Sequence, residues 1–98
     1  DDAKAILDAV AAVLVARPDV LTVEIQVHTG DQGDEDFNLR FSDARSQIIR
    51  LYLIDQGVEE GRLVAKGYGE TKPIVEGTSE KARAANRRVQ FVILDRAE

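Results

Sequence analysis

Few residues in this chain are suited to catalytic chemistry. The sequence contains 1 His and 0 Cys, so it offers neither a thiol nucleophile nor a cluster of imidazole ligands. No Ser lies in the strand-to-helix turn of a nucleophile elbow. We therefore expect no enzymatic activity and no catalytic residue, and look for binding chemistry instead.

Two segments have the residue types of a metal or phosphate site. His28 is followed by Asp31 and Asp34, but a lone His with acids in a flexible loop seldom makes a zinc site, and the spacing is not that of a calcium loop. Gly67–Gly69 is not followed directly by a helix, as a phosphate cradle requires. We expect no metal and no cofactor, and we interpret the acidic residues 31–36 as a solvated loop.

Composition limits the class of protein. The chain has 98 residues, 44% of them hydrophobic and 32% charged, which suits one small globular domain with an aliphatic core. Its net charge of −5 argues against a nucleic-acid partner, because phosphate neutralisation requires clustered Lys and Arg. No apolar run reaches membrane-spanning length, and no signal peptide is recognisable.

The first half of the chain predicts a helix, a strand and a second helix. Residues 3–16 repeat apolar side chains at helical spacing, and Pro18 ends that helix. Residues 21–27 alternate apolar and polar, which is typical of a half-buried strand. A loop precedes a helix over residues 37–56, which Gly57 closes. The predicted inward stripe of this helix is Leu39, Ser42, Ser46, Ile49 and Leu53.

The second half predicts a strand over residues 62–68, a loop over 69–78, a short helix over 79–85 with Ser79 as its cap, and a strand over 88–94. The resulting order is α-β-α-β-(short α)-β. We therefore expect an α/β fold, an α+β sandwich with one mixed sheet packed on two helices.

Four segments occur in an order that carries further information: His28–Gly33, Asn38–Ser46, Gly67–Pro73 and Asn86–Val89. Together they resemble the OmpA-like domain that binds peptidoglycan in Gram-negative envelopes, found in outer-membrane porins, Pal lipoproteins and flagellar stator subunits such as MotB. The resemblance covers roughly residues 3–94. It implies a single OmpA-like domain over residues 1–98 that is non-catalytic and anchors to peptidoglycan.

The resemblance also implies a ligand, the zwitterionic diaminopimelate residue of the stem peptide. Arg45 matches the family's Arg, which reads a carboxylate, whereas Gly30 stands where the family has an Asp for the ammonium. Losing such a charge-assisted contact costs about 1.5–3 kcal/mol, roughly ten- to a hundredfold in affinity. The adjacent Asp31 is a candidate replacement, because Gly30 and Gly33 allow the loop unusual freedom.

Other family positions are retained, each with a structural alternative. Asn38 either fixes the loop or caps the helix, and capping is at least as well supported. Arg87 either lines the pocket or forms a surface ion pair. Thr29 and Ser42 either offer hydroxyl groups to the ligand or serve in helix capping or loop bracing. The predicted ligand-binding set is Thr29, Gly30, Asp31, Asn38, Phe41, Ser42, Arg45 and Arg87.

The second predicted helix supports an alternative function. Ile48 and Leu51 stand where the resembled family more often has Ala and a charged residue, and Tyr52 lies beside them. The helical pattern predicts that Leu51 is exposed. Beside the altered loop, these side chains form a possible surface for a protein partner or a homodimer. In this alternative the scaffold is kept and peptidoglycan binding is lost.

One element of the family is missing. The family opens with a further strand before the first helix, so we expect an unfilled position in the sheet, whose open edge invites pairing with another segment. We expect the chain to be a fragment of a longer exported protein, periplasmic and associated with the outer membrane, with no direct membrane insertion of this segment.

Overall fold

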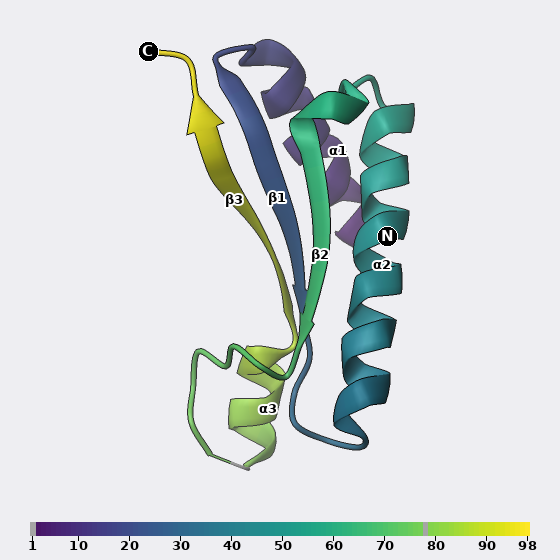
Figure 1. Cartoon of the computed structure of the whole chain (residues 1–98), viewed down its shortest axis with the longest axis vertical. Coiled ribbons are helices and arrows are strands. Elements are labelled where there is room, and N and C mark those ends of the chain that lie inside the picture. The colour runs from purple at the N-terminus through teal and green to yellow at the C-terminus, as the bar shows by residue number, and fades with distance from the viewer. Residues whose placement is uncertain (1, 78) are drawn as a thin grey trace.

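The computed structural model describes residues 2–77 and 79–98 and shows one sheet with two long helices on one face (Figure 1). The elements are α1 (Asp2–Ala16), β1 (Val20–His28), α2 (Glu35–Asp55), a 3₁₀ turn η1 (Glu60–Arg62), β2 (Leu63–Gly69), α3 (Glu80–Asn86) and β3 (Arg88–Arg96). This confirms the predicted order, with η1 added. Thr78, the last residue of the predicted loop, lies outside the described residues.

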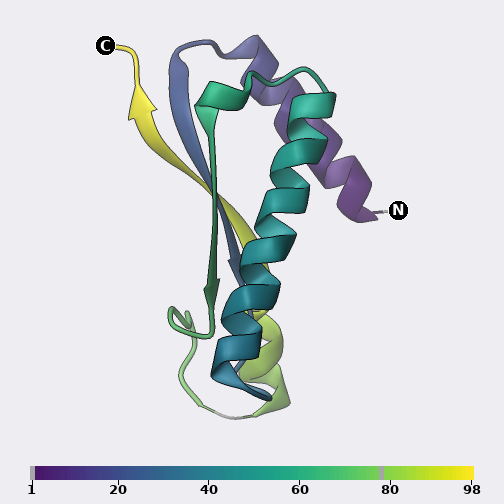
Figure 2. The ribbon, with the colours of Figure 1, turned by 45° about the vertical axis from the view of Figure 1, so that its right-hand side comes forward.

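The sheet is mixed, as predicted, and its strand order is β2-β1-β3. β1 pairs in parallel with β2 and antiparallel with β3. Val23, Ile25 and Val27 of β1 are at most 3% exposed, because the period-two alternation sends them to the face that α1 and α2 cover (Figure 2). β1 is therefore the central strand and carries much of the core.

Both ends of α2 have identifiable caps. Oδ2 of Asp34 accepts a hydrogen bond of 2.8 Å from the amide of Phe37, so Asp34 is the N-cap and α2 begins at Glu35. At the other end Gly57 has a φ of 107°, a conformation that few other residues adopt cheaply. Helix capping by Asn38, the alternative considered above, is therefore wrong, and this residue has another role.

The inward stripe of α2 differs in part from the prediction. On α2, Ser42, Ser46, Ile49 and Leu53 are buried as predicted, but Leu39 is 42% exposed and Asn38 is buried instead. The first turns of α2 lie against a polar loop, where the side-chain amide of Asn38 finds hydrogen-bond partners and a Leu side chain would not. On α1, the outward residues Ile6 and Val13 are 61% and 58% exposed.

β3 is paired along one edge only within the part of the chain that the structure describes. Beside it lies an apolar hollow of about 260 Å³. Its lining comes from α1, α2 and β3: Ala3, Ile6, Leu7, Arg45, Ile49, Val89 and Phe91. Within the described residues, the sheet thus has an unpaired edge next to apolar surface.

Candidate functional site

Several predicted ligand residues converge at one end of the sheet, where β1 ends, α2 begins and α3 leads into β3 (Figure 1). A pocket of about 240 Å³ lies there. We call it the arginine pocket; its lining residues are Val27, His28, Thr29, Phe41, Arg45, Arg87, Arg88 and Val89. Thr29, Phe41, Arg45 and Arg87 of the predicted set therefore share one cavity.

Three arginines line this pocket, and their guanidinium groups are engaged differently. Arg45 comes from α2 and has no hydrogen-bond or ion-pair partner among the described residues. Arg87, directly after α3, donates to Oε1 of Glu80 at 2.8 Å in an exposed ion pair, which contributes little to stability. Arg88 donates to the carbonyl of Lys72 at 2.9 Å. The pocket is thus strongly cationic and suits a planar carboxylate.

His28 forms part of the pocket wall and is only 4% exposed. Its Nε2 lies 3.1 Å from Oε1 of Gln26, and Nε2 of Gln26 donates to Oε1 of Glu24 at 2.7 Å. Because a carboxylate only accepts, the Gln26 amide is fixed with its oxygen toward His28, so Nε2 of His28 carries the proton. Nδ1 is then an acceptor, buried and without a partner among the described groups.

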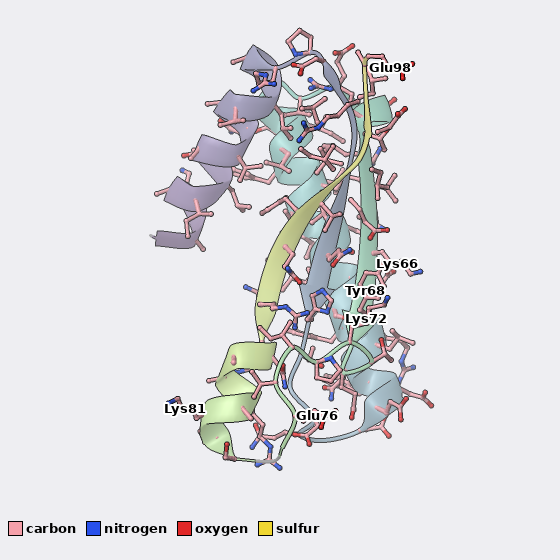
Figure 3. The ribbon with its side chains drawn as sticks, turned by 90° about the vertical axis from the view of Figure 1, so that its left-hand side faces the viewer. Lys66, Tyr68, Lys72, Glu76, Lys81 and Glu98 are labelled. Atoms are coloured by element: carbon pink, nitrogen blue, oxygen red, sulfur yellow. The ribbon has the colours of Figure 1, made fainter. Side chains whose placement is uncertain are left out.

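The ring of His28 is held on the sheet face opposite the two long helices. It stacks on Tyr68 with ring centroids 5.2 Å apart. Lys66 and Lys72 place their Nζ atoms 5.0 and 5.2 Å from the Tyr68 centroid (Figure 3). Burial lowers the pKa of His28, and the charges of Arg88 and Lys72 lower it further. The ring is therefore neutral near pH 7.

The loop after β1 packs against α3. Gly30 is buried, and a Cβ built on it would lie 3.3 Å from both Cβ and the carbonyl oxygen of Arg83. The next residue, Asp31, accepts a hydrogen bond of 2.8 Å from Nε of Arg83. This ion pair lowers the pKa of Asp31. The loop is thereby tied to α3, and Asp31 lines a separate pocket rather than the arginine pocket.

Asn38 fixes the same loop from the other side. Its Nδ2 donates to the carbonyl of Gln32 at 2.9 Å and lies 3.4 Å from Oε1 of Glu70. Together with Thr29, Gly30, Phe41 and Arg87 it lines a neighbouring pocket of about 200 Å³, completed by Gln32 and Phe37. Of its two sequence interpretations, the structure shows loop fixation.

Ser42 does not reach the site. It is 0% exposed, donates to the carbonyl of Leu39 at 2.9 Å and accepts from the amide of Gly69 at 2.9 Å. Its hydroxyl therefore joins α2 to β2 inside the fold. The prediction that Ser42 is a ligand residue is not supported by this position, because no pocket described above is lined by it.

Sequence reasoning missed three residues of this region: Arg83, Arg88 and Val89. The Asn86-Arg87-Arg88 segment contains a second Arg, which the family resemblance does not assign to the ligand. The pairing of His28 with Arg88 across β1 and β3 places Arg88 in the pocket wall, while its guanidinium lies on the sheet face that carries the His28 ring and donates to the carbonyl of Lys72. Arg83 carried no local signal, since its partner Asp31 is 52 positions away.

The candidate partner surface on α2 is exposed as predicted. Ile48 and Leu51 are 67% and 62% exposed. Tyr52 is partly buried and donates its hydroxyl hydrogen to Asp8 of α1, which raises the pKa of Tyr52 to about 12. Tyr52 therefore joins the two helices, and Ile48 and Leu51 remain as the open part of that surface.

Two features are absent from residues 2–77 and 79–98. No group of three or more His, Cys, Asp or Glu side chains in this range is placed to hold a metal ion. No helix in the same range has the length and hydropathy needed to cross a membrane.

Known proteins resemble this chain in sequence. The chain is 39% identical over 83 residues to the peptidoglycan-associated lipoprotein of Haemophilus influenzae, covering 85% of this chain and 54% of that protein. It is 36% identical over 88 residues to the peptidoglycan-binding protein ArfA of Mycobacterium tuberculosis, covering 90% of this chain and 27% of that protein. The chain thus spans only about half or a quarter of these relatives.

Solved structures resemble it as well. The peptidoglycan-associated lipoprotein from Burkholderia pseudomallei superposes with a TM-score of 0.84 at 30% identity, covering 94% of this chain and 77% of that one. The C-terminal domain of Helicobacter pylori MotB superposes with a TM-score of 0.84 at 23% identity, covering 93% and 70%, and supports the fold alone. The family model described as "OmpA family" matches residues 1–87. The chain therefore belongs to the OmpA family.

Proposed function

We propose that this chain is a non-catalytic cell-envelope domain that anchors to peptidoglycan by binding the diaminopimelate side chain of a stem peptide. The carrying observation is the arginine pocket, which Arg45 of α2 and Arg87, directly after α3, line together although they are far apart in the sequence. Relatives that match over most of this chain bear the names peptidoglycan-associated lipoprotein and peptidoglycan-binding protein. A cationic pocket in such a domain suits the carboxylate of a stem peptide.

The residues have distinct tasks in this proposal. Arg45, which has no partner among the described groups, forms the bidentate contact with the carboxylate. Arg87 and Thr29 close two sides of the pocket, and Phe41 supplies an apolar wall against the methylene chain of the ligand. Asn38 acts indirectly, by holding the loop that carries Thr29.

The direct test is a titration of the domain with a soluble stem peptide that contains diaminopimelate, measured by isothermal titration calorimetry and by NMR. Saturable binding in the micromolar to millimolar range, with chemical-shift changes confined to the arginine pocket, is the expected result. A complete lack of saturable binding at millimolar peptide rejects the proposal.

We further propose that the domain works in the periplasm as part of a larger, outer-membrane-associated protein. In that setting, the further strand expected from the family resemblance pairs with the free edge of β3, beside the apolar hollow. A version of the domain with about ten additional native residues on its N-terminal side, sufficient for one strand, should show new amide protection along β3.

A second candidate function, protein association, is favoured by the outer face of α2. The side chains of Phe37, Ile48 and Leu51 are 57%, 67% and 62% exposed. Their spacing places all three on one side of the helix. A homodimer would bury this apolar side. Sedimentation velocity over a wide concentration range tests it: association that Leu51→Glu abolishes supports a dimer, and a monomer throughout contradicts it.

A further inference from the structure

The position at which the family resemblance implies an acid for the ammonium group is tightly packed in this chain. Gly30 lies against α3, and a Cβ built on it would lie 3.3 Å from both Cβ and the carbonyl oxygen of Arg83. A side chain at this position therefore requires a small shift of α3 or of the loop. With Gly30 here, this position supplies no carboxylate.

The adjacent acid does not replace it. Asp31 is held by Arg83 at 2.8 Å and lines a different pocket, together with Glu70 and Glu76. Turning Asp31 toward the arginine pocket would break this ion pair and release the loop from α3. In the described residues, no Asp or Glu lines the arginine pocket.

What the pocket does offer is the positive charge of Arg45 and Arg87 and one neutral polar atom. Oγ1 of Thr29 is buried and has no partner among the described groups, although buried polar atoms normally have one. Thr29 lines the arginine pocket. A ligand group placed here meets guanidinium ions that attract carboxylate and repel ammonium, and Thr29 can pair with a neutral N–H.

We propose that the arginine pocket prefers a carboxylate-bearing side chain whose neighbouring amine is acylated, as it is where two stem peptides are cross-linked, over the same side chain with a free ammonium. This inference rests on the proposed function and specifies its ligand. An amide carries no charge to be repelled by Arg45 and Arg87, and its N–H suits an uncharged acceptor such as Oγ1 of Thr29.

There is also room for the chain that continues from the acyl group. Thr29 lines the arginine pocket and two neighbouring ones, of about 240 and 200 Å³. The second of these passes over Gly30, Asn38 and Phe37. The peptide that continues from the acyl group can therefore extend from the arginine pocket into these neighbouring pockets.

The test compares two probes that differ at one nitrogen: a diaminopimelate tetrapeptide with its side-chain amine free, and the same peptide N-acetylated there. Calorimetry at pH 7 should show the acetylated peptide binding about tenfold more tightly, and a cross-linked peptide dimer should behave like it. Equal affinities, or tighter binding of the free amine, overturn the inference while leaving the proposed function intact. Binding of neither peptide rejects both.

Substitutions in the loop test the same inference by changing the protein, with the same two peptides as probes. Gly30→Asp introduces the acid and should reverse the preference toward the free amine. Gly30→Ala makes the same contact with Arg83 without the charge and is its matched control, so it should keep the preference for the acetylated peptide. Melting curves establish that both variants fold.

A third variant, Asp31→Asn, tests the neighbouring acid directly and does not depend on the tight contact at Gly30. The preference for the acetylated peptide should remain, because Asp31 is engaged by Arg83. A loss of free-amine binding in Asp31→Asn would show that Asp31 reads the ammonium, and would overturn the inference.

Discussion

The backbone amide of Gly67 on β2 donates a hydrogen bond of 3.2 Å to Oδ1 of Asp43 on α2. The two backbones approach so closely that a Cβ on Gly67 would overlap the nitrogen and Cα of Asp43. Helix α2 therefore lies directly on β2, with no side chain between them at this point. This contact sets the position of the helix that carries Phe41 and Arg45 to the pocket.

Gly67→Ala should destabilise the domain strongly, by about 3 kcal/mol, because α2 must move away from the sheet to admit one methyl group. Urea unfolding followed by circular dichroism measures the free energy of unfolding. Gly61→Ala is the control: a Cβ at that position meets nothing within 4 Å, so its effect should be small. Similar losses in the two variants would contradict the close approach.

Ser42→Ala should cost about 1–3 kcal/mol, because it leaves the buried amide of Gly69 without its acceptor. Ser46 is also 0% exposed, but its hydroxyl donates only to the carbonyl of Asp43 within the same helix. Ser46→Ala should therefore cost clearly less. If both substitutions have the same effect in urea unfolding, the link between α2 and β2 does not contribute as described.

Much of the fold could be predicted because its signals are local. The alternation in β1, the proline after α1 and the cap at Ser79, which accepts from the amide of Ala82 at 3.1 Å, each act within a few residues. The burial of Asn38 in place of Leu39 in the inward stripe of α2 could not be predicted from such local signals. It depends on the loop carbonyl of Gln32, which the helix meets only in the folded chain.

The site was predictable in its cations and not in its loop. The Asn86–Val89 segment and Arg45 indicate two guanidinium groups, Arg87 and Arg45, and both line the pocket. The packing of Gly30 could not be predicted from the sequence alone. Its neighbour Arg83 is far away in the chain, and only the folded structure shows the tight contact between them.

The single His allows a clean pH experiment. Burial and the charges of Arg88 and Lys72 lower the pKa of His28, partly opposed by Glu24, so its imidazole should titrate below the unfolded value of about 6.5. Between the two pKa values the unfolded chain binds more protons, so stability falls as the pH drops through 6.5 toward the folded pKa. NMR of the ring protons measures the folded value directly.

Unfolding in urea between pH 7.5 and 5.5 gives the matching stability change, and His28→Gln should flatten it in that window. The comparison concerns the slope with pH and not the absolute stability, since the stack on Tyr68 is altered in the variant. A ring that titrates at or above 6.5 would contradict the neutral, acceptor state of Nδ1 inferred from Gln26 and Glu24.

Arg45 should contribute most of the affinity for a stem-peptide carboxylate. It lines the pocket with no partner among the described groups, so Arg45→Ala removes a ligand contact without breaking one inside the fold. We expect binding to weaken by about ten- to a hundredfold, the equivalent of roughly 1.5–3 kcal/mol for a hydrogen bond to a charged group. Arg45→Lys should recover only part of the affinity, because an ammonium cannot form the planar two-point contact.

Arg40→Ala, an exposed substitution on the same helix outside the arginine pocket, is the control. Equal affinities for the Arg45→Ala and Arg40→Ala variants in the calorimetric titration would show that the carboxylate binds elsewhere.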